Sequence, residues 1–147
     1  MRVHFAPCLD SEKVLKIAQY LPATYAELDR RAKWMRGKWP KRVTCMSNAE
    51  IVDGRARGAG HGFTYTSGSN SGTIWLNPDM TWQGYWLVLV HENCHHAWPD
   101  ATEGEINCRH VPSIYEAVFG KKLTPAMGRA HGLGAPVTGV GDRSYCR

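Results

Sequence analysis

The stretch VHENCHHAW, from Val90 to Trp98, decides how the chain is interpreted, because two of its histidines are four residues apart and a glutamate follows the first. An α-helix turns about 100° per residue, so such histidines lie about 40° apart and about 6 Å apart along the axis. In a helix, His91 and His95 therefore point the same way and can bind one metal ion, with Glu92 beside it. The H-E-x-x-H pattern is typical of zinc-dependent hydrolysis.

The residues that lead into this motif, YWLVLV at positions 85–90, are apolar around the whole circumference of a helix. They predict a central, buried helix that begins after the pair Asn77-Pro78 and ends at Trp98. Periodicity alone would also allow a strand here, and the need for His91 and His95 on one face favours the helix. Burial of these imidazoles without a polar partner would be costly, which favours a metal site.

The remaining elements follow from periodicity and turn signals. Helices are expected from Ser11 to Leu21, from Thr24 to Met35, and from Thr102 through Phe119 with a break at Val111-Pro112. Strands are expected in KRVTCMS (41–47), GFTYTS (62–67) and GTIWLN (72–77), whereas EIVDGRARGAG (50–60) is expected to turn on its glycines. From about residue 120 the chain is a Gly/Pro-rich tail.

Length and composition indicate a single domain over residues 1–147, since 43% of the residues are hydrophobic and 21% are charged. The N-terminal stretch MRVHFAPCLDSEK lacks the continuous apolar core of a secretory signal, and no apolar run is long enough to span a bilayer. Five cysteines form no C-x-x-C pair, which argues against a disulfide framework and fits a reducing compartment. We therefore expect a cytoplasmic location and no membrane partner.

The net charge of +5 is concentrated in RRAKWMRGKWPKR, Arg30 to Arg42, which has seven Lys or Arg in thirteen positions. With Trp34 and Trp39 interleaved, this segment could follow a phosphate backbone and stack on bases. The plainer interpretation is a solvated helix face followed by a turn. No nucleic-acid-binding motif accompanies the segment.

The order of elements, a strand in GTIWLNP, a short linker, the H-E-x-x-H helix and an acidic second helix, resembles the zincin metallopeptidases. The likeness is closest to the gluzincins, including the small ImmA/IrrE-type peptidases, whose second helix carries E-x-x-[A/S]-[D/N]. The matching stretch here runs from Glu103 to Asn107, with Ile106 in place of the small residue and a short separation from His95. The resemblance covers residues 72–107. It implies an α+β, zincin-like fold in which a small mixed β-sheet packs on a central H-E-x-x-H helix with further helices.

Three other families share parts of the pattern. HENCHHAW also resembles SprT-like proteases, which act on proteins attached to DNA and whose third ligand, a later histidine, would be His110 here. A peptide deformylase-like amide hydrolase is a minor alternative because the segment 45–47 (CMS) lies upstream, although Val90 stands where that family has Gln. The metzincin pattern fails, because Trp98 and Ala101 occupy its glycine and third-ligand positions.

The third zinc ligand could be Glu103, Glu105 or His110. On one α-helix Glu103, Asn107 and His110 share a face, whereas Glu105 lies about 200° from Glu103 and is expected to pair with Arg109 on the solvent side. We favour Glu103, which comes first after the chain turns back, with Asn107 hydrogen-bonding a ligating histidine. The other two residues remain alternatives.

The sequence thus predicts a zinc-dependent peptidase in which Zn²⁺, held by His91, His95 and Glu103, activates a water molecule. Glu92 is the expected general base. His110 is the preferred residue for stabilising the oxyanion. Further candidates for that role are Tyr115, His131 and Tyr145.

Smaller roles are expected for several other residues. The segment Trp75, Leu76 and Asn77 should form a free strand edge that binds an extended peptide or protein substrate by strand addition. His96 should be a surface or supporting histidine, and Cys94 and Cys108 should be small core residues. The alternative from another class is a DNA-associated or regulatory binding protein that uses residues 30–42 to bind nucleic acid.

Overall fold

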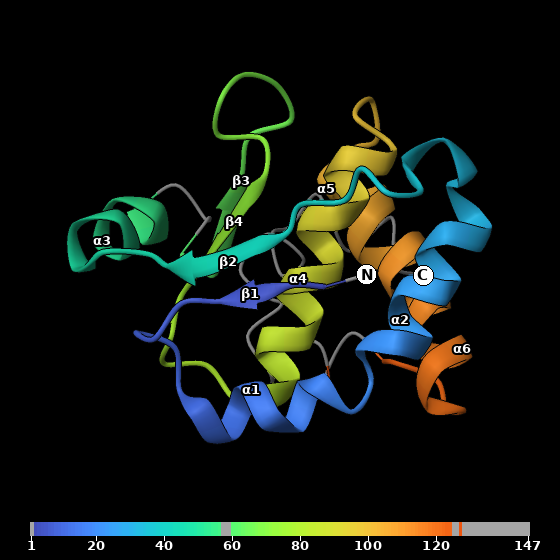
Figure 1. The fold of residues 1–147 in the computed structure, drawn as a ribbon, viewed down its shortest axis with the longest axis horizontal. Helices are drawn as coiled ribbons and strands as arrows, with labels where there is room; N and C mark the ends of the chain where they lie inside the picture. The colour runs from blue at the N-terminus through green and yellow to red at the C-terminus, as the bar shows by residue number, and fades with distance from the viewer. Residues whose placement is uncertain (1, 57–59, 125–126, 128–147) are drawn as a thin grey trace.

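The computed structural model describes residues 2–56, 60–124 and 127 of the chain. Its centre is helix α4 (Trp82–Ala97), which contacts strands of a small mixed sheet as well as the surrounding helices (Figure 1). The predicted α+β class with a small mixed sheet on the H-E-x-x-H helix is confirmed at this level of detail.

The sheet described here has four strands in the order β1-β2-β4-β3. Their bounds are β1 (His4–Phe5), β2 (Arg42–Cys45), β3 (Gly62–Thr64) and β4 (Thr73–Leu76). Strands β1, β2 and β4 run parallel, and β3 runs antiparallel to β4. The two edge strands are therefore β1 and β3.

The prediction of a free strand edge at Trp75, Leu76 and Asn77 is wrong. Strand β4 has a neighbour on both sides, and Trp75 itself is in register with Thr44 of β2 and Phe63 of β3. Asn77 is buried and donates its backbone N–H to the carbonyl of the residue before β3. The alternation of side chains in a sequence reports the two faces of a strand but not which strands flank it. The edge on this side of the sheet is β3.

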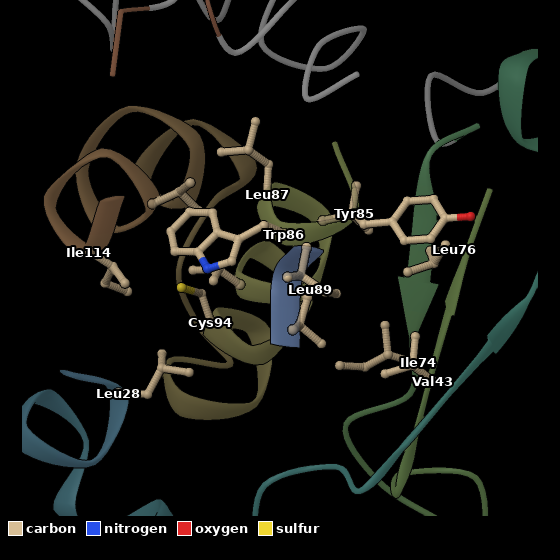
Figure 2. Close-up of a cluster of buried hydrophobic side chains, with 14 of the residues drawn as sticks. Leu28, Val43, Ile74, Leu76, Tyr85, Trp86, Leu87, Leu89, Cys94 and Ile114 are labelled. Atoms are coloured by element: carbon tan, nitrogen blue, oxygen red, sulfur yellow. The ribbon is translucent and has the colours of Figure 1, made fainter. Parts of the chain in front are cut away.

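Helix α4 is buried along almost its whole length because both of its sides have an apolar partner. Figure 2 shows Leu89 pointing toward Ile74 and Val43 of the sheet, whereas Trp86 points the other way, toward the surrounding helices. At its start, the Thr81 hydroxyl accepts the N–H of Gly84 at 3.0 Å, which satisfies one of the unpaired N–H groups of the first turn. The predicted central, buried helix is confirmed.

Seven other helical elements are described. They are α1 (Ser11–Ala18), α2 (Leu21–Arg31), the short 3₁₀ helix η1 (Lys33–Met35), α3 (Asn48–Ala56), α5 (Glu103–Glu105), the π-helical turn η2 (Ile106–His110) and α6 (Val111–Phe119). Asp10 rather than Ser11 caps α1, since its carboxylate accepts two backbone N–H groups of the first turn.

Helix α3 replaces the glycine turns that were expected after residue 50. The Ser47 hydroxyl accepts the N–H of Glu50 at 3.1 Å, and the Glu50 carboxylate accepts the N–H of Ser47 at 2.8 Å. This reciprocal pair is a capping box, whose S-x-x-E signature was present in the sequence. The cap starts a helix that continues through Gly54, so glycine spacing was the weaker signal here.

The second acidic helix is not one continuous α-helix. It starts at α5, passes into the π turn η2 at Ile106 and continues as α6. The predicted break at Val111-Pro112 is therefore misplaced, because the irregularity lies before it. Pro112 sits in the first turn of α6.

The expectation of no disulfide framework is also wrong. Cys8 is bonded to Cys45, because the parallel pairing of β1 with β2 brings the chain after β1 to the end of β2. Cys108 is disulfide-bonded as well and packs against the core, whereas Cys94 is a fully buried free cysteine. The cysteine argument for a reducing compartment is thereby removed. Within the described part of the chain, no helix is long and apolar enough to cross a membrane.

The Cys8–Cys45 bond generates a stability prediction. The two cysteines are 37 residues apart in the sequence, and closing a loop of that length removes unfolded-state entropy worth about 3–4 kcal/mol. We expect Cys8→Ser and Cys45→Ser to lower the free energy of unfolding by about that amount. The double variant should lose no more than either single variant, because all three lack the same bond. Denaturant unfolding under non-reducing conditions measures this, and additive losses would contradict the pairing.

Candidate metal centre

Helix α4 presents the two motif histidines side by side. The Nε2 atoms of His91 and His95 lie 3.1 Å apart, as expected for residues one turn apart on a helix. His91 is almost fully buried and His95 is partly exposed. Two ring nitrogens therefore converge at the border between the core and solvent.

Glu103 completes a group of three donors. One of its carboxylate oxygens lies 2.9 Å from His91 Nε2, and the other lies 2.8 Å from His95 Nε2. The chain reaches this position through a tight turn at Trp98, after which Thr102 starts helix α5 with a capping box. Glu103 is thus the first residue of a capped helix that begins directly opposite α4.

The spacing of these three donors fits a zinc ion. Tetrahedral zinc with bond lengths of about 2.0–2.1 Å places neighbouring ligand atoms about 3.3 Å apart. Here the two ring nitrogens are 3.1 Å apart, and each lies 2.8 or 2.9 Å from its own oxygen of the Glu103 carboxylate. Two imidazoles and one carboxylate are also the donor set of many catalytic zinc sites. His91, Glu92 and His95 likewise offer ligand atoms within 4.8 Å of one another. Of the two carboxylates, Glu103 lies closer to the ring nitrogens than Glu92, so Glu103 is the better-placed candidate for the ligand position.

Asn107 holds the His91 ring from behind. Its Oδ1 lies 2.7 Å from His91 Nδ1, and both side chains are buried. An N–H at Nδ1 that donates to Asn107 leaves Nε2 to face the other donors, which is the usual arrangement for a metal-binding histidine. Asn107 therefore has the position that the sequence predicted for it.

Without a metal ion, the same contacts stabilise a proton in the group. Burial acts to lower the pKa of His91, but its hydrogen bond to Glu103 and the charges of Glu92 and Glu103 together raise that pKa above the usual value. Burial also opposes ionisation of Glu103, yet hydrogen bonds to His91 and His95 hold its pKa far below the usual range. A zinc ion would therefore replace a proton on the imidazole of His91, which lies next to the ionised carboxylate of Glu103.

Glu92 lies beside the three donors without joining them. Its carboxylate is buried, with Oε2 3.9 Å from His91 Nε2, and burial raises its pKa. Strand β3 passes close by at Gly62, where an added Cβ would collide with Val88 Cγ1, lie 2.8 Å from Trp75 O and come within 3.7 Å of Glu92 Oε2. Glycine at this position allows the edge strand to approach the carboxylate.

His110 is not part of this group. Its ring stacks on Trp98 with centroids 4.1 Å apart and planes 7° apart, and burial lowers its pKa. The expectation that His110 shares a face with Glu103 and Asn107 assumed α-helical geometry. Residues 106–110 instead form a π turn, whose wider i→i+5 hydrogen bonding changes the direction of the residues that follow.

The remaining predicted residues have other surroundings. Tyr115 is buried against the rings of Trp86 and Phe119, and His131 and Tyr145 lie outside the described residues. The Glu105 carboxylate takes part in the Thr102 capping box instead of the expected pair with Arg109.

His96 links α4 to β3, since its Nε2 lies 2.8 Å from the Thr64 hydroxyl oxygen. This contact joins two elements of the fold and involves none of the three donors, so a role for His96 in supporting the metal site stays a prediction.

His61 was missed by sequence reasoning. It directly precedes β3, and burial together with the charges of Arg55 and His91 lowers its pKa. Its buried Nδ1 has no hydrogen-bond partner within the described residues. Because thirty residues separate it from the motif, only the pairing of β3 with β4 and the packing of both on α4 bring it near His91. No local pattern in the sequence signals that approach.

Comparison of the chain with models of protein families, with curated proteins and with solved structures found no match.

Metal analysis of single variants tests the donor set. We expect His91→Ala, His95→Ala and Glu103→Ala each to lose zinc, because each removes one of three protein ligands. His110→Ala is the matched control and should retain it. Inductively coupled plasma analysis after dialysis against zinc gives the stoichiometry. Zinc retained by Glu103→Ala but lost by His110→Ala would replace our assignment with the histidine-liganded alternative.

Zinc affinity should also depend on pH in a defined direction. Zinc has to displace the proton that the raised pKa holds on His91, so affinity falls as the pH decreases through that pKa. The fall should begin above about pH 6.5, the ordinary histidine value. Glu103 stays ionised in this pH range, so it adds nothing to the dependence of zinc affinity on pH. Competition with a chromophoric chelator measures the affinity.

The variant Glu103→Gln gives the matched comparison for this titration. It removes the charge that raises the His91 pKa, so zinc binding should be weaker overall and its decrease should shift to lower pH. An affinity that is independent of pH in the parent protein would contradict the protonation described for His91.

Proposed function

We propose that the protein is a zinc-dependent peptidase with a zincin-like arrangement of its site. The observation that carries this proposal is the carboxylate of Glu103 within 2.9 Å of both ligand nitrogens of the H-E-x-x-H motif. Ion pairs of this kind occur without metals. Here, however, the two histidines and Glu103 form a donor set of the zinc type, and the buried carboxylate of Glu92 lies beside that set without belonging to it. That combination is the composition of a catalytic rather than a purely structural zinc site.

The roles of the residues follow from their positions. His91, His95 and Glu103 would hold the zinc ion, which would supply a polarised substrate carbonyl and an acidified water molecule. Asn107 fixes the tautomer and orientation of His91. Glu92 is the proton acceptor, and the pKa that burial raises makes it a stronger base than an exposed carboxylate; the proton it takes then passes to the leaving amine.

Strand β3 replaces Trp75, Leu76 and Asn77 as the proposed substrate edge. It is the outer strand on the side of the sheet next to Glu92, and an extended peptide could pair with its free side. Gly62 keeps that edge close to the carboxylate. His61, at the start of this strand, is a better-placed candidate than His110 for contacting the oxyanion.

The alternatives have less support. Liganding by His110, as in SprT-like proteases, would require its ring to leave the stack on Trp98. A deformylase-like site would require a free thiolate at Cys45, whose sulfur is bonded to Cys8. The cytoplasmic location stays a prediction, without the support of the cysteines.

The substitution Glu92→Gln tests the proposed reaction. The amide keeps the shape of the side chain but cannot accept a proton, so hydrolysis should fall about 10²- to 10⁴-fold. Zinc content and the thermal unfolding temperature should change little. Cleavage of an internally quenched peptide library, followed by mass spectrometry of the products, measures the rate.

Glu116→Gln, an exposed glutamate on α6, is the matched control and should keep full activity. A Glu92→Gln protein that cleaves as fast as the parent would show that Glu92 is not the base. Zinc-loaded parent protein that cleaves no peptide in the library would overturn the peptidase assignment.

A further inference from the structure

The face of the sheet that points away from α4 carries a continuous set of polar, basic and aromatic side chains. Successive side chains of a strand alternate between the two faces. Because Val43 and Ile74 are buried against α4, their neighbours lie on the opposite, outer face. The outer-face residues in register across the sheet are His4, Arg42, Thr44, Thr73, Trp75 and Phe63.

Three aromatic rings gather at the β4–β3 side of this face. Phe63 and Trp75 stack with centroids 5.0 Å apart and planes 10° apart. Tyr65 contacts both rings edge-on, with centroids 5.9 and 5.6 Å away, and is 51% exposed. We call these three residues the aromatic platform. Tyr65 thus leaves an aromatic ring of the platform accessible to a ligand.

Cationic side chains gather at the β1 side of the sheet, around the outer-face residue His4. An open pocket there is lined by Arg2, His4, Asp29, Arg36, Gly37 and Lys41. Arg42 is exposed next to His4, with which it is in register. Asp29 offsets part of this charge, and its carboxylate also accepts the indole N–H of Trp39 at 2.7 Å. Two arginines and a lysine against one aspartate leave this basic pocket positive, and Arg42 adds a further positive charge next to it.

The pocket and the platform lie within reach of one ligand. His4 and Trp75 are on the first and third strands of the order β1-β2-β4-β3. Their strands are two spacings, about 10 Å, apart, and Trp75 lies two residues beyond the position in register with His4, so the two residues are about 12 Å apart. That is a distance over which an extended chain of a few units can contact cations with one part and aromatic rings with another.

The residues of the basic segment from Arg30 to Arg42 do not all lie on one surface. Trp39 is buried, whereas Trp34 is 55% exposed and donates its indole N–H to the Ala97 carbonyl at 3.0 Å. Arg30 and Arg31 are both paired with Glu27.

Trp39 is therefore not accessible to a ligand, and Trp34 lies beside Trp98 at the end of α4 instead of on the sheet. Only its later cations, Arg36, Lys41 and Arg42, join the outer face, where residues distant in the sequence supply the aromatic rings.

We propose that the outer face of the sheet binds single-stranded nucleic acid, with phosphates in the basic pocket and bases on the aromatic platform. Positive charge alone would suit any polyanion, but stacked and edge-on aromatic rings beside it match ligands that alternate anionic groups with flat rings. Bases in a duplex are already stacked on one another, so the platform can accept only unpaired ones. Because Glu92 lies on the opposite face of the sheet, this surface does not depend on the proposed peptidase site.

Fluorescence anisotropy with the full chain and labelled oligothymidine tests the proposal. We expect binding that weakens with salt, and weaker binding to a duplex of the same length. Tyr65→Ala should reduce affinity about fivefold or more, the effect of losing one stacked base. Tyr65→Phe, which keeps the ring, should bind like the parent. Lys41→Ala and Arg36→Ala should each lower the slope of log affinity against log salt by roughly 0.7.

Matched controls separate this surface from general charge and from the metal centre. Lys16→Ala, on exposed α1, removes one positive charge elsewhere and should leave affinity nearly unchanged. Glu92→Gln should bind oligothymidine like the parent.

Three results would overturn the proposal. They are no binding at low salt, Tyr65→Ala binding as tightly as the parent, or polyglutamate competing as well as oligothymidine. The last result would show a surface for acidic proteins instead.

Discussion

Helix α4 has to bury apolar surface on nearly every side and still present two imidazoles and a carboxylate near its C-terminal end. Buried polar groups are costly without partners, so these three can be tolerated only if neighbouring elements supply partners at the right places. Glu103 and Asn107 provide them for His91. The rest of the architecture can be understood as the means by which those partners are brought to α4.

The chain after α4 accomplishes this over a very short distance. The tight turn at Trp98 and the Thr102 capping box start the next helix directly against the histidines, so Glu103 needs no long connection. The π turn that follows lets the helix continue as α6, which packs on α4 and α2. It also turns His110 onto Trp98, leaving a donor set of two imidazoles and one carboxylate. A local irregularity of the backbone thus decides which side chains meet.

The two faces of the sheet lie next to different candidate sites, although the residues of the two faces alternate in the sequence. Its inner face packs on α4, and at Gly62 its edge strand comes close to Glu92. Its outer face combines cations from the N-terminus and from the segment after α2 with aromatic rings from β3 and β4. Since side chains alternate along a strand, residues adjacent in sequence, such as Gly62 and Phe63, serve opposite faces.

The sequence alone determined what depends on local spacing. His91, Glu92 and His95 lie within one turn and a half of one helix, and a fully apolar run before them requires that helix to be buried; both follow from 3.6-residue periodicity. It also indicated Glu103, because the chain between α4 and the next helix is too short to bring many other residues back. What only the tertiary structure decided depends on contacts between distant segments. These are the edge position of β3 instead of β4, the approach of His61, the Cys8–Cys45 bond and the removal of His110 by a π turn. Strand neighbours and helix irregularities are set by the packing of the whole chain, for which a local pattern carries no unique signal.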